Sequence, residues 1–335
     1  MITAKKHLDI ASRHLVVVVP AFNEEDVLSD TIEALLGTVP DRVTALGMTC
    51  EFIFVNDGST DATPGLLDCW ADNEARIRVV HLTRNFGHQP AVSAGLCVAL
   101  ESADVIAVMD CDLQDPPEVM CDMLERWADG YDVVYGVRRN RKESVVRRFG
   151  YSVFYKLLAA VSDFDIPRDS GDFCVMDRRV AELMQNLPER QRFIRGLRAW
   201  VGLRQTGFKY DRPARAAGET HYSLHQLLKF ASDGLVSFSN LPLGLVTRVG
   251  VACGIGAFLM FAWVVLDGLF GLTNAAPGWP SMAALVLFIG AVQMISLGIF
   301  GEYLGRVFAE VKGRPTYLIA RIEGESRCEQ RSKAA

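Results

Sequence analysis

The sequence VIAVMDCDLQDPP, residues 105–117, combines an apolar run, two closely spaced acids and a proline pair at the start of a helical pattern. The run 105–109 is continuous rather than alternating, which is typical of a strand buried on both faces of a parallel sheet. Asp110 and Asp112 follow it directly. In open α/β sheets the carboxyl ends of the strands carry the functional site. We therefore expect an α/β fold with a site at this position.

The same order of strand and helix repeats through residues 1–140. Runs rich in Val and Ile predict further strands, and the segments between them have helical patterns. Alternation of the two predicts an open, Rossmann-like, mainly parallel sheet. The predicted strands are 15–19, 52–55, 77–82, 105–109 and 133–135, and the predicted helices are 26–36, 63–73, 90–101 and 116–128.

Two long apolar stretches lie near the carboxyl end of the chain, at residues 249–266 and 282–300. Each is close to the roughly 20 residues that a helix needs to cross the hydrocarbon core of a bilayer. Backbone polar groups must be satisfied within lipid, so both stretches should be transmembrane helices. The loop 268–281 has no Lys or Arg, whereas basic residues flank the pair, and this bias predicts that both ends face the cytoplasm.

The segment before these stretches contains a basic cluster at 138–148 and two amphipathic runs, 149–161 and 224–238. Basic residues beside an apolar helical face suit a bilayer surface that contains anionic lipid. An ordinary solvated charge run is the alternative, but the neighbouring apolar stretches favour membrane contact. We therefore expect helices at the membrane interface in this part of the chain.

The composition excludes several classes of protein. A formal net charge of −5 argues against a dedicated nucleic-acid-binding domain, which would have a basic excess. The 8 cysteines include no Cys-x-x-Cys pair, so free thiols are expected rather than a zinc ribbon or a disulfide scaffold. The amino terminus lacks the long apolar core and small-residue cleavage site of a secretory signal.

Polar motifs also follow the first two predicted strands, at residues 20–25 (PAFNEE) and 55–61 (VNDGSTD). Taken alone, each is ordinary helix-start or turn chemistry. Asp57 can accept hydrogen bonds from a nucleobase edge, and Gly58 allows a tight turn. The position of both motifs at strand ends is what makes them candidates for a binding site.

Asp110 and Asp112, together with the amide of Gln114, are the stronger signal. Oxygen atoms are the ligands that Mg²⁺ and Mn²⁺ prefer, and these ions commonly keep substrate phosphates in their shell. Such an ion would offset the charge that builds on a departing diphosphate. The sequence therefore predicts a divalent-metal site at these three residues, with Cys111 pointing towards the core.

Together, PAFNEE, VNDGSTD, RNFGHQ, MDCDLQDPPE and RAAGET resemble the family-2, GT-A fold glycosyltransferases that load sugars onto polyprenyl phosphate. This group includes dolichol-phosphate mannose synthase. The resemblance covers residues 14–315. The segments RDSGDF (168–173) and ERQRFIRG (189–196) are most similar to the bactoprenol glucosyltransferase branch.

The resemblance implies roles for individual residues. Asp172 matches an acidic position linked to activity, and we expect it to orient the sugar or an arginine, with base catalysis as the lesser alternative. Lys is expected in place of His221, which leaves the role of His221 open, and His88 is not expected to act directly. The matched positions are Pro20, Phe22, Asn23, Glu24, Asp57 and Asp110 for the nucleotide, Asp110, Asp112 and Gln114 for the metal, Arg138, Arg147 and Arg215 for the acceptor phosphate, and Asp112, Arg138 and Asp172 for catalysis.

The implied reaction is inverting transfer of a sugar, with glucose from UDP-glucose as the first expectation, to undecaprenyl phosphate with Mg²⁺ or Mn²⁺. Most hydroxyl acceptors need a general base. A phosphate monoester, whose second pKa is about 6, is already an oxyanion near neutrality. The enzyme would be a multi-pass protein of the bacterial inner membrane with a cytoplasmic catalytic domain. The chain is expected to form a homo-oligomer such as a tetramer. A separate flippase and a downstream transferase are the expected partner proteins.

These expectations divide the chain into a nucleotide- and metal-binding part (1–140), an acceptor-binding and interface part (141–242), two transmembrane helices (243–305) and a cytoplasmic tail (306–335). Alternative donors are GDP-mannose, UDP-GlcNAc or a UDP-aminoarabinose derivative. A non-catalytic nucleotide-binding membrane protein is the alternative from another class. A processive polysaccharide synthase is disfavoured, because QRFIR lacks the spacing of a Gln-x-x-Arg-Trp motif and only two spans are predicted.

Overall fold

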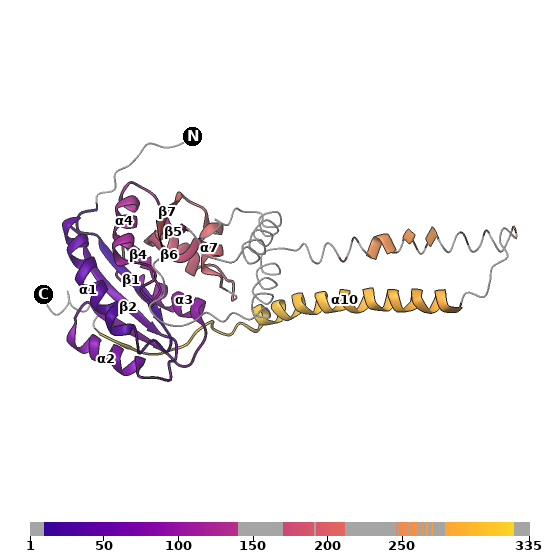
Figure 1. Ribbon diagram of the computed structural model, residues 1–335, viewed down its shortest axis with the longest axis horizontal. Helices are drawn as coiled ribbons and strands as arrows, with labels where there is room; N and C mark the ends of the chain where they lie inside the picture. Colours follow the sequence, from indigo (N-terminus) through magenta and orange to yellow (C-terminus); the bar gives the residue numbers. More distant parts are fainter. Residues whose placement is uncertain are drawn as a thin grey trace. The chain divides into compact units, whose positions relative to one another are not determined.

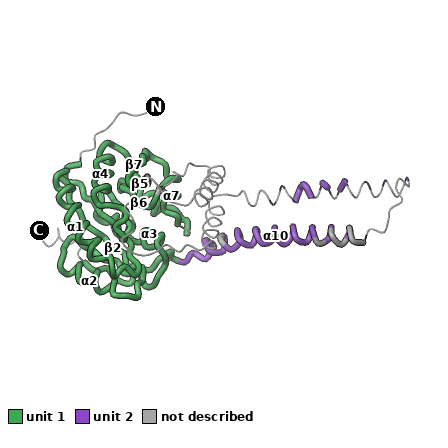
Figure 2. Tube along the Cα trace, in the orientation of Figure 1, with its two compact units in different colours: residues 1–155, 164–221, 315–335 green, residues 156–163, 222–314 purple. Residues whose placement is uncertain are grey.

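The computed structural model describes residues 10–139, 170–190, 192–211 and 279–324, with scattered residues between 246 and 270. The chain forms two compact units (Figure 2). The predicted interface helices lie outside the described residues. The first unit comprises residues 1–155, 164–221 and 315–335, and the second comprises residues 156–163 and 222–314.

The first unit consists of a sheet and the helices that cover it (Figure 1). The strands are β1 (His14–Ala21), β2 (Thr49–Asn56), β3 (Ile77–Leu82), β4 (Val105–Val108), β5 (Val133–Arg139), β6 (Ser170–Asp177), β7 (Gln205–Asp211) and β8 (Ile319–Glu323). The helices are α1 (Leu28–Ala45), α2 (Thr63–Asn73), α3 (His88–Ala99), α4 (Pro117–Ala128), α6 (Arg178–Gln185) and α7 (Ile194–Val201). All the strands and helices predicted within residues 1–140 are present; 63–73 and 77–82 have the predicted bounds, and the others differ at one or both ends.

The eight strands form one sheet in the order β7-β5-β6-β4-β1-β2-β3-β8. β1 pairs in parallel with β2 and β4, β2 with β3, and β5 with β7. β6 runs antiparallel to β4 and β5, and β8 runs antiparallel to β3. The prediction of a mainly parallel α/β sheet is therefore confirmed.

Helices cover both faces of this sheet, which explains the continuous apolar runs of its strands. Along β1, Val17 and Val19 pack in one core cluster with side chains of α1, α2 and α4. Val16 and Val18 face the other way and pack with side chains of α3, α6 and α7. Gly95 of α3 brings that helix close to the sheet, because a Cβ there would lie 2.3 Å from Cγ1 of Val18.

Three strands were not predicted from the sequence: β6, β7 and β8. β6 inserts antiparallel between β4 and β5 and brings its first residues to the edge where β4 ends. β8 comes from the predicted cytoplasmic tail and adds an antiparallel edge strand beside β3. Residues near the carboxyl terminus are therefore part of the same sheet as the amino-terminal motifs.

The second unit contains the helix α10 (Trp279–Lys312), which has 34 residues. At about 1.5 Å per residue it is roughly 50 Å long. Among the described residues, its segment Phe288–Lys312 is the one helical stretch long and apolar enough to cross a membrane. α10 includes the predicted span 282–300. The other predicted span, 249–266, lies largely outside the described residues and stays a prediction.

Candidate active site

The predicted motifs meet at the carboxyl ends of β4, β1 and β2, which are neighbours in the sheet. The turn after β1 is tied to the turn after β2. The Asn23 N–H donates to Oγ of Ser59 at 3.0 Å, and Oδ1 of Asn23 accepts from the Thr60 N–H at 2.9 Å. The Glu24 N–H donates to Oγ1 of Thr63 at 2.9 Å. These hydrogen bonds hold the two turns together, so that they form one continuous surface.

Asp57 holds a third loop against this surface. Its carboxylate is buried and accepts from the N–H groups of Phe86 and Gly87, both at 2.8 Å. Burial raises the pKa of Asp57, and the two backbone hydrogen bonds oppose that shift. Gly58 has a φ of +66°, and a Cβ there would lie 2.3 Å from the carbonyl carbon of Arg84. Glycine is therefore required where the two loops meet.

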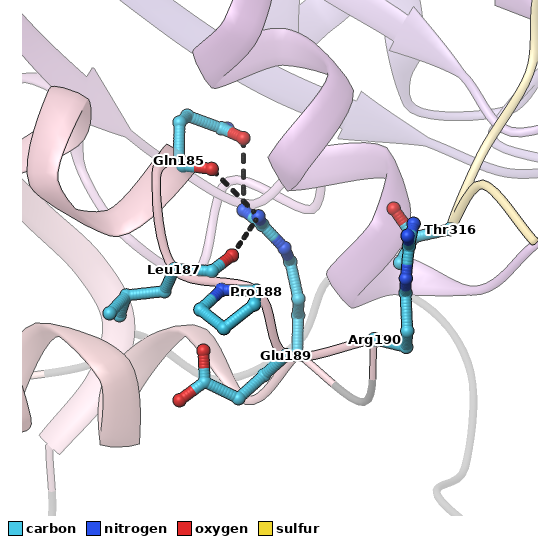
Figure 3. Close-up of a pocket in the computed structure, with 7 residues that line it drawn as sticks. Gln185, Leu187, Pro188, Glu189, Arg190 and Thr316 are labelled. Carbon is cyan, nitrogen blue, oxygen red and sulfur yellow. Dashed lines mark hydrogen bonds between the residues drawn. The ribbon is translucent and has the colours of Figure 1, made fainter. Parts of the chain in front are cut away.

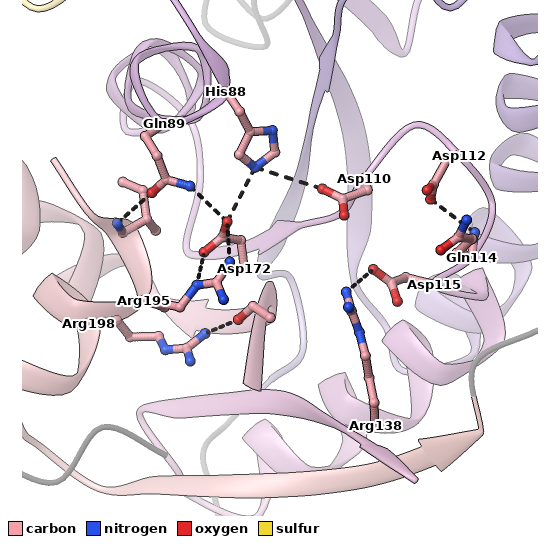
Figure 4. Close-up of polar contacts among 12 residues, drawn as sticks. His88, Gln89, Asp110, Asp112, Gln114, Asp115, Arg138, Asp172, Arg195 and Arg198 are labelled. Carbon is pink, nitrogen blue, oxygen red and sulfur yellow. Dashed lines mark hydrogen bonds and ion pairs between the residues drawn. The ribbon is translucent and has the colours of Figure 1, made fainter. Parts of the chain in front are cut away.

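The acidic loop after β4 carries Asp110, Asp112 and Gln114 (Figure 4). The Gln114 N–H donates to Oδ1 of Asp112 at 3.2 Å, and Leu113 between them has a φ of +54°. Burial raises the pKa of Asp110, and neighbouring carboxylates add to this effect while His88 opposes it.

The oxygen atoms of this loop fit a hard divalent cation in ligand type, since two are carboxylates and one is an amide. Within the described part of the chain, no group of three or more His, Cys, Asp or Glu side chains forms a cage on its own. Further ligands would therefore come from water or substrate phosphates, which is the usual coordination of Mg²⁺. Cys111, in the middle of the loop, is buried as predicted.

β6 brings Asp172 to the same edge, where three side chains contact its carboxylate (Figure 4). Nε2 of Gln89 donates to Oδ2 at 2.8 Å, and Nε of Arg195 donates to Oδ1 at 3.3 Å. Nε2 of His88 lies 3.3 Å from Oδ2 of Asp172 and 3.8 Å from Oδ1 of Asp110. His88, which was not expected to act directly, thus lies between two predicted site residues.

The charges around Asp172 determine its protonation. The residue is only 7% exposed, and burial alone would raise the pKa of its carboxyl group. The hydrogen bond from His88, the positive charges of Arg195 and His88, and the hydrogen bond from Gln89 instead hold the pKa of Asp172 well below its usual range. Burial lowers the pKa of His88, but Asp172 and Asp110 outweigh burial and raise it. Asp172 is therefore a firmly ionised carboxylate beside cationic groups.

Gln89 also connects Asp172 to α7. The Ile194 N–H donates to Oε1 of Gln89 at 2.7 Å, so the amide oxygen faces the helix and the amide nitrogen faces Asp172. Ile194 is the first residue of the helix that carries Arg195. One amide group thus positions both the carboxylate and the helix that carries its cationic partner.

Arg138, near the end of β5, lies close to a second buried acid (Figure 4). Its Nη2 is 3.9 Å from Oδ2 of Asp115, whose side chain is fully buried. The hydroxyl of Tyr210 donates to Oδ1 of Asp115. Gly171 leaves room for this arginine, because a Cβ there would lie 3.2 Å from Nη2 of Arg138.

Several residues at this edge were missed by sequence reasoning. Arg198 is fully buried, donates from Nη1 to the Gly171 carbonyl at 3.5 Å and lies 4.9 Å from the ring centre of Tyr135. Gln89 lies in the segment RNFGHQ and Arg195 in ERQRFIRG, and these two segments were the only indication in the sequence that the residues belong to the site. The predicted residues at the strand ends of this edge are Pro20, Phe22, Asn23, Glu24, Asp57, Asp110, Asp112, Gln114, Arg138 and Asp172. Arg147, Arg215 and His221 lie outside the described residues.

A separate cavity of about 250 Å³ lies beside the loop that joins α6 to α7 (Figure 3). The guanidinium of Arg192 donates to Oε1 and the carbonyl of Gln185 at 2.9 and 3.1 Å, and to the Leu187 carbonyl at 3.1 Å. These bonds shape the loop. The cavity is lined by none of the predicted site residues; its lining consists of Gln185, Leu187, Pro188, Glu189, Arg190, Arg192 and Thr316.

Comparison with known proteins points to one family. Residues 16–184 match glycosyl transferase family 2. An uncharacterized glycosyltransferase of Synechocystis sp. is 42% identical over 312 residues, which cover 92% of this chain and 96% of that protein. The uncharacterized glycosyltransferase YkcC of Bacillus subtilis is 40% identical over 316 residues, covering 93% and 96%. A prophage bactoprenol glucosyl transferase homolog of Escherichia coli is 38% identical over 309 residues, covering 92% and 98%.

Proposed function

This chain belongs to glycosyl transferase family 2, and we propose that it transfers a sugar from a nucleotide sugar to a polyprenyl phosphate. The observation that carries the proposal is Asp172, held ionised beside His88 and Arg195 next to the acidic loop. Similarity to a bactoprenol glucosyl transferase homolog along 92% of this chain supports the choice of acceptor.

The chemistry of a phosphate acceptor suits this site. A sugar nucleotide reacts when a nucleophile attacks its anomeric carbon while the nucleoside diphosphate departs. General base catalysis is efficient when the pKa of the base lies near the working pH, and the depressed pKa of Asp172 makes it a poor base. A phosphate monoester needs none, because its second pKa is about 6. Asp172 would therefore act by orienting its cationic partners.

The donor would bind where the first two turns meet. The turn of Asn23 and Glu24, together with Asp57, would hold the nucleoside. Arg138 would contact the acceptor phosphate, because arginine binds phosphate oxygens in a bidentate geometry. Asp110, Asp112 and Gln114 would hold Mg²⁺ or Mn²⁺, which offsets charge on the departing diphosphate. Arg147 and Arg215 remain predicted contacts of the acceptor phosphate.

UDP-glucose is the donor that we propose first, because the motifs at 168–173 and 189–196 are most similar to the bactoprenol glucosyltransferase branch. A single in-line displacement would invert the anomeric centre. GDP-mannose, UDP-GlcNAc and a UDP-aminoarabinose derivative are the alternatives within the same reaction. They differ in nucleobase and in sugar hydroxyl groups, so competition assays separate them.

The proposed setting is the cytoplasmic face of the bacterial inner membrane. The length and apolar composition of Phe288–Lys312 support membrane association. A second span at 249–266, interface helices, a homo-oligomer such as a tetramer, a separate flippase and a downstream transferase complete the proposal. Protease protection of epitope tags in oriented vesicles tests the number of spans, because two spans leave both ends of the chain on one side.

The experiment that tests the function is transfer of labelled glucose from UDP-glucose to an organic-extractable product. It uses purified full-length protein, undecaprenyl phosphate and Mn²⁺. We expect product from the wild type and none with EDTA or with Asp112→Asn. Asp129→Asn is the matched control, since Asp129 is a half-exposed carboxylate at the end of α4 that pairs with Arg126 at 3.6 Å. It should retain wild-type activity.

Failure with UDP-glucose alone redirects the assay to the other donors. Failure with every donor, in protein that still binds nucleotide, refutes the proposed transfer and supports the non-catalytic alternative. Product that forms in the presence of EDTA refutes the metal site. An α-linked product from an α-linked donor refutes the single displacement.

A further inference from the structure

A row of polar side chains crosses the sheet next to the turn after β2, which we call the donor turn (residues 57–61). None of these side chains belongs to the site described above. Asn56, His81 and Arg321 come from β2, β3 and β8, and they occupy paired positions across the three strands. Asp68 of α2 lies over this row. Side chains opposite one another on neighbouring strands share a face and contact each other. The row therefore links the carboxyl-terminal strand with the end of β2.

Every link in the row is a hydrogen bond. Nη2 of Arg321 donates to Oδ2 of Asp68 at 2.6 Å, and Oδ1 of Asp68 lies 2.8 Å from Nε2 of His81. Nδ1 of His81 lies 3.0 Å from Nδ2 of Asn56. Oδ1 of Asn56 then accepts from the Ser59 N–H at 3.0 Å. His81 and Asn56 are 5% and 4% exposed, so water does not replace these partners.

The direction of each hydrogen bond follows from Asp68. An ionised carboxylate only accepts, so Nε2 of His81 must carry the proton. In a neutral imidazole the other nitrogen is then an acceptor, and it receives a hydrogen bond from the NH₂ group of Asn56. This leaves the amide oxygen of Asn56 facing the Ser59 N–H. Burial lowers the pKa of His81, with Arg321 adding to this effect while Asp68 and Glu323 oppose it, which favours the neutral ring.

Reversing the direction of these hydrogen bonds would disturb the donor turn. If Nδ1 of His81 carried the proton, Asn56 would have to present its oxygen to the histidine and its NH₂ group to Ser59. Two donors would then face each other. Ser59 also accepts from the Asn23 N–H through its hydroxyl, at 3.0 Å. A shift of the Ser59 backbone would therefore move the turn of Asn23 and the neighbouring Asp57.

We propose that Asp68 and His81 are positioning residues for the donor nucleotide, and that Arg321 stabilises them from the carboxyl-terminal strand. The inference rests on the proposed function only in taking these turns as the nucleotide site. β8 begins at Ile319, shortly after α10 ends at Lys312. The strand that follows the apolar helix thus supports the turn that binds the donor.

The test measures the dissociation constants of UDP and GDP by calorimetry, with Mn²⁺ and full-length protein but without acceptor. For the nucleotide that the wild type binds, Asp68→Ala should raise the dissociation constant about tenfold, because no acceptor then keeps the proton of His81 on Nε2. Asp68→Asn keeps an acceptor oxygen for His81 and should stay within about threefold of the wild type. Asp72→Ala removes an exposed carboxylate from the same helix and should change nothing.

Sugar transfer and thermal unfolding separate a positioning role from a structural one. In Asp68→Ala the KM for the donor should rise about tenfold while kcat and the KM for the acceptor stay within twofold. Arg321→Ala, at a half-exposed position, tests the same row from its outer end and should raise the donor KM about threefold. It provides the decisive measurement if Asp68→Ala does not fold.

The outcomes are distinct. A lower melting temperature with an unchanged nucleotide dissociation constant in both variants overturns the positioning role. Nucleotide binding that responds as expected, in a wild type that transfers no sugar, overturns the proposed function and leaves this inference standing. A wild type that binds neither UDP nor GDP overturns both.

Discussion

Asp172→Asn separates the two roles that a carboxylate at this position can have. In the wild type the carboxylate accepts from Gln89 at 2.8 Å and Arg195 at 3.3 Å, and it lies 3.3 Å from Nε2 of His88. An asparagine keeps one acceptor oxygen but turns an NH₂ group towards one of these donors. A hydrogen bond to a charged group contributes about 1.5–3 kcal/mol. A loss of about 3 kcal/mol in the transition state lowers kcat/KM about 150-fold.

The pH profile distinguishes orientation from base catalysis. Because the pKa of Asp172 is held well below its usual range, this group stays ionised across the working range and gives no acid limb of its own. The acid limb should come from the acceptor phosphate, whose second pKa is about 6, and should therefore persist in Asp172→Asn. The assay is kcat/KM for labelled sugar transfer between pH 5 and 9, with calorimetry to verify that the donor still binds.

Two results would refute this reasoning. Disappearance of the acid limb in Asp172→Asn, together with a loss beyond about 10⁴-fold, would make Asp172 a general base. Unchanged turnover in a folded variant would remove Asp172 from the site. The matched control is Asp177→Asn at the other end of β6, where the carboxylate caps α6 by accepting from the Arg179 N–H at 3.0 Å. Asparagine caps helices about as well as aspartate, so this variant should keep both its stability and its kcat/KM close to the wild-type values.

Three further predictions concern the rest of the site. Gly58→Ala should abolish nucleotide binding in calorimetry because its Cβ would lie 2.3 Å from backbone, whereas Gly65→Ala on α2 meets nothing within 4 Å and should bind normally. Burial raises the pKa of Cys111 to about 12, so its thiol should resist alkylation at pH 8 in native protein and react in urea, as mass spectrometry can show. Tyr210→Phe removes a donor to the buried carboxylate of Asp115 and should lower the free energy of unfolding in urea by about 1–3 kcal/mol.

The strands predicted from the sequence are those buried on both faces, because only there does a continuous apolar run mark a strand. β7 (QTGFKYD) has one buried residue, and β8 (IARIE) has none. Edge strands need no such run, since one side of the ladder is open and polar side chains are tolerated. β6 has a short apolar core, FCVM, that periodicity alone does not distinguish from a helical turn.

The acidic loop was predictable because its residues are close in the sequence and directly follow a strand. The contacts of Asp172 were not. Gln89 and Arg195 lie 83 and 23 residues away from it, and local spacing does not specify contacts over such distances. Arg198 was not predicted for another reason: arginine is rarely fully buried, and nothing in the local sequence marks this one as an exception.

The buried arginine explains how the site keeps its charges in place. Arg198 has its ring partner in Tyr135 of β5 and a carbonyl partner in Gly171, the residue before Asp172. It therefore connects α7 to β5 and β6 at the point where the carboxylate emerges. Gln89 makes the second connection, from α3 to the first residue of α7. These two connections fix the start of α7, and the Arg195 backbone with it, beside Asp172, so the ion pair between them starts from a backbone that is already in position.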